Sequence, residues 1–213
     1  MLTRLKNIWR PENFHLQHRL GRRASFFEGW YFKLVDGAGD RPWAVIPGVF
    51  LGDDAHAFIQ LLDGSAGTSA YHRFALDEFC ADADCFDVSI GRNRFHRGGM
   101  HLDIGARETD AQQAVNGTIL FSDWTGWPVN LASPGVMGPY SFVPLMECNH
   151  GILSMDHDLS GKLAVDGETV RYDGGRGYIE KDWGRGFPRG YVWAQSNHFD
   201  EDGVSVSASV ARI

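Results

Sequence analysis

Three carboxyl groups in this sequence have neighbours that a solvent-exposed acid does not need. Glu28 lies in FFEGWYFKLVD, residues 26–36. Alternation along a strand would place it on one face with three aromatic residues, Phe26, Trp30 and Phe32. A carboxyl group in such a row is expected to be buried, and burial raises its pKa unless a cation pairs with it. The segment therefore predicts either a general acid kept protonated or a Glu–Arg or Glu–Lys pair inside the core.

The other two acids are close together in GRGYIEKDWGRGFPRG, residues 175–190. In an extended strand Tyr178, Glu180 and Asp182 share one face. The residues between and beside them, Ile179, Lys181 and Trp183, face the other way. Two carboxyl groups at this spacing repel each other when charged, which raises one pKa and lets them divide acid and base roles. The alternative is a solvated, charged strand edge that nearby arginines neutralise.

A third polar cluster lies in PLMECNHGILSMDHDLSG, residues 144–161. Glu147 and His150 fall on opposite faces of an expected strand, whereas a zinc site needs three or four convergent ligands. We therefore predict no metal site and expect His150 to be an orienting hydrogen-bond partner. The sequence contains no nucleophile elbow, phosphate-binding loop or dinucleotide fingerprint, so no cofactor is predicted.

The elements that would position these residues are short strands, because apolar residues follow a period of two and Gly, Asp, Asn and Pro interrupt them. One or two helical turns are expected over 76–82, and a packed lid is expected over the Gly- and Pro-rich stretch 122–144. The predicted strands cover 26–35, 43–51, 55–62, 69–76, 85–90, 99–105, 115–121, 148–155, 159–166, 168–173, 176–183, 190–198 and 204–212.

Composition supports one large all-β domain. The chain has 213 residues, 43% of them apolar, with 26 glycines and seven tryptophans. So many strands and turns predict an antiparallel barrel or sandwich over residues 25–213. The final segment, GVSVSASVARI, looks like a strand with no turn or polar tail after it, so we expect the natural chain to continue beyond it.

Charge is distributed unevenly along the chain. Residues 1–23 contain six lysines and arginines and one acid, Glu12, although the net charge of the whole chain is −7. This balance argues against a nucleic-acid partner. The basic N-terminal arm, residues 1–24, either pairs with the acidic body of the protein or contacts an anionic membrane surface.

The chain also lacks an apolar run of the ~18 residues that a membrane span needs and an apolar signal-peptide core. Its three cysteines, Cys80, Cys85 and Cys148, have no zinc spacing and fit buried free thiols in a reducing compartment. A Cys80–Cys85 bridge would require a turn that brings the two residues together. We therefore predict a cytoplasmic protein, with peripheral membrane contact through the basic arm as the open alternative.

Three long motifs resemble the tocopherol cyclase family. They are FFEGWYFKL at 26–34, MECNHGILSMDHDLSG at 146–161 and GYIEKDWGRGFPRGYVWAQSNHF at 177–199, and they follow the family's order. The DWG of the third motif is also similar to carotenoid hydratases. The resemblance implies a lipocalin-like (calycin) barrel. Because family members are longer and have a second β-rich half, it also implies that this chain is the N-terminal part of a two-barrel protein.

Family chemistry begins when a proton is added to an alkene, after which a phenolic oxygen or water captures the cation. This requires a protonated carboxylic acid in an apolar site, a dry cavity and aromatic faces beside the cation. The resemblance implies Asp182 or Glu180 as the proton donor, with Glu28 as a further acid of the site. The substrate-binding residues that it implies are Trp30, Tyr178, Trp183, Trp193 and His150.

Two functions from different classes follow. The first is a cofactor-free cyclase or hydratase, an intramolecular lyase or its water-adding counterpart, that acts on an isoprenoid or prenylated aromatic in a hydrophobic barrel. The second is a non-catalytic carrier of a hydrophobic isoprenoid or lipid in a similar cavity. A carboxyl group with a raised pKa distinguishes them, because a carrier has no use for one.

Overall fold

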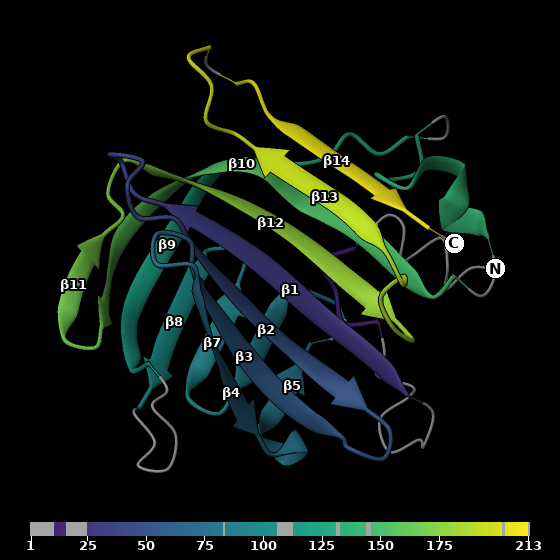
Figure 1. Cartoon of the computed structure of the whole chain (residues 1–213), viewed down its shortest axis with the longest axis horizontal. Helices are drawn as coiled ribbons and strands as arrows, with labels where there is room; N and C mark the ends of the chain where they lie inside the picture. The colour runs from purple at the N-terminus through teal and green to yellow at the C-terminus, as the bar shows by residue number, and fades with distance from the viewer. Residues whose placement is uncertain are drawn as a thin grey trace.

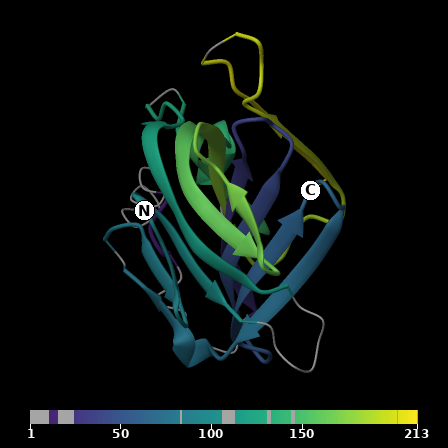
Figure 2. The same cartoon turned by 90° about the vertical axis from the view of Figure 1, so that its left-hand side faces the viewer.

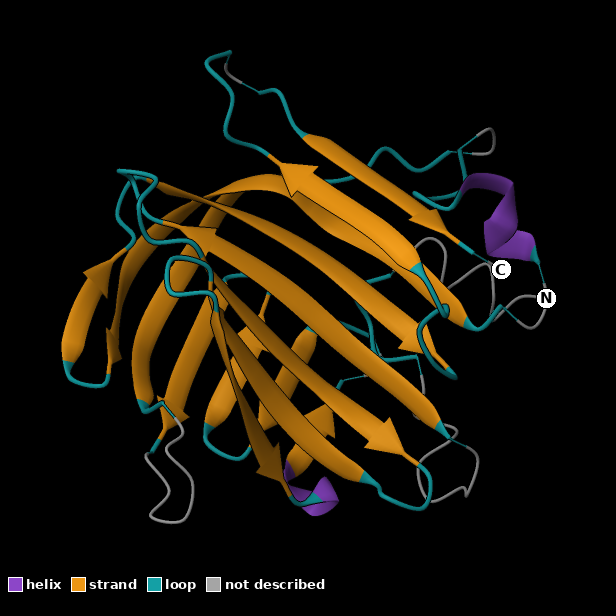
Figure 3. Ribbon diagram, in the orientation of Figure 1, coloured by secondary structure: helices purple, strands orange, loops and turns teal. Residues whose placement is uncertain are grey.

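The structure, a computed structural model, describes residues 11–15, 25–82, 84–105, 113–130, 133–143, 146–201 and 203–212. Strands dominate these ranges (Figure 3), and the helical segments there are the short 3-10 turns η2 and η3. Their bounds are β1 Phe26–Val35, β2 Trp43–Leu51, β3 His56–Asp63, β4 Thr68–Phe74, η2 Leu76–Glu78, β5 Phe79–Ala81, β6 Asp87–Ile90, β7 Asn93–His96, β8 Gly99–Ile104, β9 Val115–Thr125, η3 Gly138–Phe142, β10 Cys148–Val165, β11 Glu168–Arg171, β12 Gly175–Gly184, β13 Tyr191–Ser196 and β14 Val206–Ala211.

Twelve of the described strands form one antiparallel sheet in the order β4-β3-β2-β1-β12-β10-β9-β8-β7-β6-β5, with β11 attached to β10. The sheet curls round a single core (Figure 1, Figure 2). Because η2 joins the two edge strands β4 and β5, β3 approaches β6 across the seam and the barrel nearly closes. The predicted all-β antiparallel barrel is therefore confirmed. No helix in the described ranges is long and apolar enough to cross a lipid bilayer.

The sheet bends at β10, which is one strand of 18 residues where the sequence predicts two. Its register with β12 shifts twice between Ile152 and His157, so the strand is bulged rather than interrupted. Glycines further along permit the close approach of neighbouring backbones. A Cβ on Gly161, at φ +116°, would lie 2.3 Å from the Thr118 carbonyl oxygen of β9. Only glycine fits such a position, and this allows the sheet to coil.

The interior of the barrel is packed with aromatic rings. Phe32 lies at the centre, with ring centroids 5.6–6.1 Å from those of three further phenylalanines, Phe86, Phe95 and Phe121. Trp30 stacks on Phe86 at 6.2 Å. These side chains belong to the buried core of the barrel. Large rings on alternate inward positions of the strands fill a barrel of this size.

A second layer covers part of the outer surface of the barrel. Strands β13 and β14 form a separate hairpin that lies over β10 and β12 (Figure 1). Beneath it a small outer cluster forms around Ile152, Met155 and Tyr178, with Trp127 and Trp193 packed against it. The described part of the predicted lid, 126–130 and 133–143, contributes to this cover, whereas 122–125 belongs to β9. Both faces of β12 are consequently covered over most of its length.

The described part of the N-terminal arm, residues 11–15, packs into one end of the barrel instead of lying in solvent. Asn13, Phe14 and His15 are all buried. The Trp30 Nε1–H donates a hydrogen bond to the Glu12 carbonyl oxygen at 3.1 Å. Residues 1–10 and 16–24, which carry the basic residues proposed for membrane contact, lie outside the described ranges.

Several shorter predictions need correction. Residues 76–82 contain one helical turn, η2, as the lower of the two expectations had it, but the rest of this stretch forms β5, and neither β5 nor β7 was predicted. All three cysteines are free, as expected, but Cys80 and Cys85 are exposed rather than buried. Cys80 lies on the short edge strand β5 and Cys85 in the following turn, where the sheet does not cover them.

Gly48 on β2 gives a direct test of packing on the outer surface. The Phe58 ring packs against this residue, so a Cβ at position 48 would lie 2.4 Å from Phe58 Cζ and 2.8 Å from the Glu28 carbonyl oxygen. We expect Gly48→Ala to lower the free energy of unfolding by about 1–3 kcal/mol, because the ring and backbone must move apart. Urea denaturation measures the change. Gly105→Ala, with no described atom within 4 Å of its Cβ, is the control and should stay within about 1 kcal/mol; equal losses in the two variants would contradict this account.

Candidate active site on the outer face of the barrel

The pairing of β12 with β1 and β10 gathers the candidate site on the outer face. Glu180 lies opposite Tyr31 of β1 on one side and Ile152 of β10 on the other. Asp182 lies opposite His150 of β10. Cross-strand partners in an antiparallel sheet project on the same side, so these side chains converge.

Glu180 is the most deeply buried acid of this group, at 5% exposure. Its Oε2 accepts hydrogen bonds from the Tyr178 hydroxyl at 2.5 Å and from the Trp193 indole N–H at 3.0 Å. Burial, together with a smaller effect of the Asp182 charge, raises the pKa of Glu180 to about 7 against the opposing effects of His150 and the two hydrogen bonds. Glu180 is therefore a carboxyl group that is protonated in a large share of molecules at neutral pH.

His150 lies between the two carboxyl groups. Its Nδ1–H donates to Asp182 Oδ1 at 2.9 Å, and its Nε2 lies 3.5 Å from Glu180 Oε2. Burial lowers the pKa of His150, but the hydrogen bond that it donates to Asp182 and the charges of both acids more than offset this and raise the pKa above its ordinary value. The backbone N–H of His150 donates to Met137 Sδ at 3.1 Å, because none of the described strands pairs with this part of β10 on that edge.

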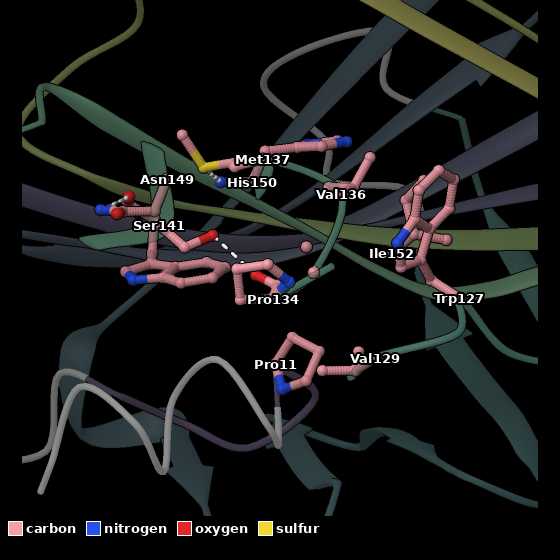
Figure 4. Close-up of a pocket in the computed structure, with 13 residues that line it drawn as sticks. Pro11, Trp127, Val129, Pro134, Val136, Met137, Ser141, Asn149, His150 and Ile152 are labelled. Atoms are coloured by element: carbon pink, nitrogen blue, oxygen red, sulfur yellow. Dashed lines mark hydrogen bonds between the residues drawn. The ribbon is translucent and has the colours of Figure 1, made fainter. Parts of the chain in front are cut away.

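A cavity of about 140 Å³ opens beside His150 (Figure 4). Its wall is mostly apolar, with a few polar groups from β10 and η3. The lining residues include Trp127, Val136, Met137, Ile152, Pro11 and Trp183, with Asn149, His150 and Ser141 as polar members. A cavity of comparable volume in another protein holds one benzene ring. The site thus offers space for a ring-sized apolar group next to a titratable pair.

The raised pKa of Glu180 makes the free energy of unfolding depend on pH. Glu180 has a pKa of about 7 when folded, against 4.5 as its reference value. The folded chain thus holds a proton that the unfolded chain releases, and stability falls as pH rises from about 4.5 through 7. The raised pKa of His150 acts in the same direction. From pH 5 to 8 we expect wild type to lose about 2–3 kcal/mol relative to Glu180→Gln in urea denaturation; parallel curves for the two proteins would contradict the raised pKa.

Glu28 lies on the opposite face of the sheet, inside the barrel. It is fully buried and forms an ion pair with Lys181, whose Nζ lies 2.5 Å from Glu28 Oε1. The His15 backbone N–H donates to the same oxygen at 2.8 Å, and Lys181 Nζ donates to the Asn13 carbonyl oxygen. Burial lowers the pKa of Lys181, and Glu28 opposes the shift. The pair therefore holds the N-terminal segment in the end of the barrel.

The structure brings together five of the eight residues that the sequence analysis proposed. On the outer face these are His150, Tyr178, Glu180, Asp182 and Trp193. The other three, Glu28, Trp30 and Trp183, lie on the inner face around Lys181, whose Nζ is 4.9 Å and 5.0 Å from the two indole centroids. Trp183 still reaches the cavity wall. The structure therefore does not place all three acids in one site.

Sequence analysis missed Lys181 as the partner of Glu28 and Tyr31 as a wall of the outer site. Tyr31 packs edge-on against Trp193 at 5.4 Å, and burial together with Glu180 raises its pKa to about 12. The strand face on which each side chain lies could be predicted from the period of two. The pairing of β1 with β12, about 150 residues away in the sequence, could not. The lid that contains Trp127 and Val136 could be predicted from the aromatic content of the Gly- and Pro-rich loop.

His150, Glu180 and Asp182 could also be considered as metal ligands, because one donor atom from each lies within 4.8 Å of the others. Two donors argue against this use. The Tyr178 O–H and the Trp193 N–H both point at Glu180 Oε2, which is also the atom nearest to His150. A cation there would meet two hydrogen-bond donors, so the geometry suits a proton better than a metal.

Comparison with solved structures shows the fold. A crystal structure of a candidate AttH from Nitrosomonas europaea superposes with a TM-score of 0.51 and 14% identity, covering 94% of this chain and 65% of that one. At this identity the likeness extends to the fold alone.

Comparison with curated proteins gives short matches. A protein of Oryza sativa subsp. japonica named "probable tocopherol cyclase, chloroplastic" is 36% identical over 52 residues, which are 24% of this chain and 11% of that protein. The tocopherol cyclase, chloroplastic, of Zea mays is 38% identical over 63 residues, 29% of this chain and 13% of that protein. The matches span only about a tenth of the length of these relatives.

A family model extends the match. Residues 90–212 fit the family described as tocopherol cyclase-like, a range that contains His150, Glu180 and Asp182 but not β1. This range is more than half of the 213 residues. The chain therefore belongs to the tocopherol cyclase-like family.

Proposed function

We propose that the outer-face site transfers a proton from Glu180 to an alkene of an isoprenoid or prenylated aromatic compound. An oxygen nucleophile then captures the tertiary cation, which gives ring closure if the nucleophile is a phenol of the same molecule and hydration if it is water. The observation that carries this proposal is a buried carboxyl group with a pKa of about 7 that lies 3.5 Å from His150, a residue that lines a mostly apolar, ring-sized cavity.

Glu180 suits the donor role better than Asp182 or Glu28. Asp182 accepts a hydrogen bond from His150, and its side chain is 21% exposed against 7% for Glu180. Glu28 is neutralised by Lys181 on the other face. A proton donor must be held as the neutral acid in a site from which water is excluded, and burial of Glu180 provides both conditions.

Aromatic side chains border the acid. Trp193 donates to Glu180 and packs against Tyr31 and Tyr178, with centroid distances of 5.4 Å and 6.4 Å. The faces of such rings stabilise a nearby positive charge. This arrangement supports a carbocation intermediate and does not serve simple storage of a ligand.

The test uses the full-length protein and a prenylated methylhydroquinone kept reduced. Cyclisation is an isomerisation, so the expected product has the mass of the substrate and a different retention time; a gain of one water identifies hydration. A substrate that binds and is recovered unchanged would contradict the proposal and favour the carrier function.

A further inference from the structure

The imidazole of His150 has one ring nitrogen, Nε2, that makes no hydrogen bond within the described ranges, although the Glu180 carboxyl group lies 3.5 Å away. Nδ1 is committed to Asp182 at 2.9 Å. Nε2 is buried, and no hydrogen-bond partner for it exists among the residues that the structure describes. A buried polar atom without a partner carries a free-energy penalty in the unliganded protein, and a bound hydroxyl group would remove it.

The residue that carries this nitrogen borders the space where a nucleophile would be held. His150 forms part of the wall of the 140 Å³ cavity, next to Asn149 and Ile152 (Figure 4). The same nitrogen lies 3.5 Å from Glu180 Oε2. A hydroxyl group in the cavity that donates to Nε2 would therefore be adjacent to the acid as well as to the imidazole.

The chemistry requires a proton acceptor at this point. Protonation of the alkene consumes the proton of Glu180, and capture of the cation by an O–H group releases one proton from that oxygen. Neither ring closure nor hydration changes the proton count, so the released proton must return to Glu180 before the next turnover. A group beside both the nucleophile and the acid completes the cycle most directly.

We propose that His150 takes the proton of the attacking hydroxyl group at Nε2 and returns it to Glu180, while Asp182 holds the imidazole in position. This inference rests on the proposed function and adds to it a base and a proton path. In this assignment His150 touches the nucleophile, and Asp182 is a positioning residue.

The steps balance. The alkene electron pair forms a C–H bond as the Glu180 O–H bond breaks. A lone pair of the hydroxyl oxygen then forms the C–O bond, and the O–H bond breaks as the proton moves to Nε2. The imidazolium that results lies between the carboxylates of Asp182 and Glu180, both of which stabilise it. Transfer of the Nε2 proton to Glu180 restores the starting state.

The surroundings of the imidazole favour this cycle. The titratable groups that face it are Asp182 and Glu180 of β12, with Tyr178, Tyr31 and Cys148 close to the same carboxyl groups. The pKa values of these three are all raised, so at neutral pH they stay uncharged and leave the two carboxyl groups as the charges that act on His150.

The first test compares His150→Gln with wild type in two regimes, using reduced prenylated methylhydroquinone. With enzyme in excess and loaded at pH 7, near the pKa of Glu180, the first turnover should stay within about threefold of wild type, because formation of the cation needs only the proton that Glu180 already holds. With substrate in excess, the steady-state rate should fall by roughly 10²-fold, because the proton is not returned. Added imidazole should restore part of the steady-state rate.

Controls separate this inference from loss of structure. His101→Gln, on the exposed face of β8, should leave both regimes unchanged. A second variant, His150→Asn, keeps an N–H group that can donate to Asp182 but has no ring nitrogen to accept a proton. If both His150 variants unfold at the same temperature as wild type, loss of structure does not explain a lower rate. An unchanged steady state in His150→Gln, or equal losses in both regimes, would overturn the relay.

The outcome also separates the two proposals. If wild type gives no product, the proposed function is wrong and the relay with it. If wild type gives product and His150→Gln behaves as wild type, the relay alone is wrong. The mass of the product shows whether the hydroxyl group on Nε2 belongs to the substrate or to water.

Discussion

Glu180→Gln is expected to lower the turnover number for a prenylated hydroquinone by roughly 10²–10⁴-fold, the range typical of a positioned general acid. Glutamine keeps the shape of the side chain and an oxygen that accepts from Tyr178 and Trp193, so the fold should be preserved. It carries no transferable proton, however. The effect should appear in the first turnover as well as at steady state, which distinguishes Glu180 from His150.

The pH profile gives this prediction a second readout. Because the acid form is active and its pKa is about 7, kcat/KM should fall tenfold per pH unit above that value. The measurement is the rate of product formation between pH 5 and 9. Glu168→Gln is the control, since this glutamate lies on β11 in an exposed ion pair with Arg41. A Glu180→Gln enzyme as active as this control would exclude Glu180 as the donor.

Lys181→Met is expected to cost about 3–5 kcal/mol of unfolding free energy, the largest effect on stability that we predict. The substitution leaves the Glu28 carboxylate in the barrel interior without its cation, and it removes the donor to the Asn13 carbonyl oxygen. Urea denaturation at pH 7 measures the loss. Release of residues 11–15 from the end of the barrel should accompany it, detected as faster proteolysis of the N-terminus.

The double variant Glu28→Leu/Lys181→Met tests the cause. Replacing a buried ion pair with apolar groups of similar size is often neutral, so the double variant should recover most of the lost stability. Arg94→Met, which breaks an exposed pair with Asp87, should cost less than about 1 kcal/mol. Equal losses for Arg94→Met and Lys181→Met, or no recovery in the double variant, would contradict the assignment of the pair.

Alternation along the strands was enough to assign side chains to faces. It correctly grouped Tyr178, Glu180 and Asp182 on one side of β12 and Lys181 on the other. It also left open a Glu–Lys pair around Glu28, which the structure contains. These inferences are local, because each depends on a period of two within one strand.

The combination of these strands into one site could not be inferred in the same way. The sequence does not show that β1 pairs with β12, and this pairing places Glu28 beside Lys181 rather than beside Glu180. Nor does it show that β13 covers the outer face of the sheet. Both faces of β12 are lined with aromatic residues for that reason, so aromatic neighbours alone could not identify which acid lies in the ligand site.

Successive residues of β12 carry separate tasks, with Lys181 directed to the core and its two neighbours, Glu180 and Asp182, to the outer site. Loss or gain of one residue in this strand would exchange the two faces and abolish both arrangements together. Substitutions, in contrast, act on one face at a time. Point mutations at 180 or 182 can therefore change the chemistry of the outer site while the folding interactions of 179 and 181 persist. Insertions and deletions within the strand would disrupt both, so we expect them to be selected against.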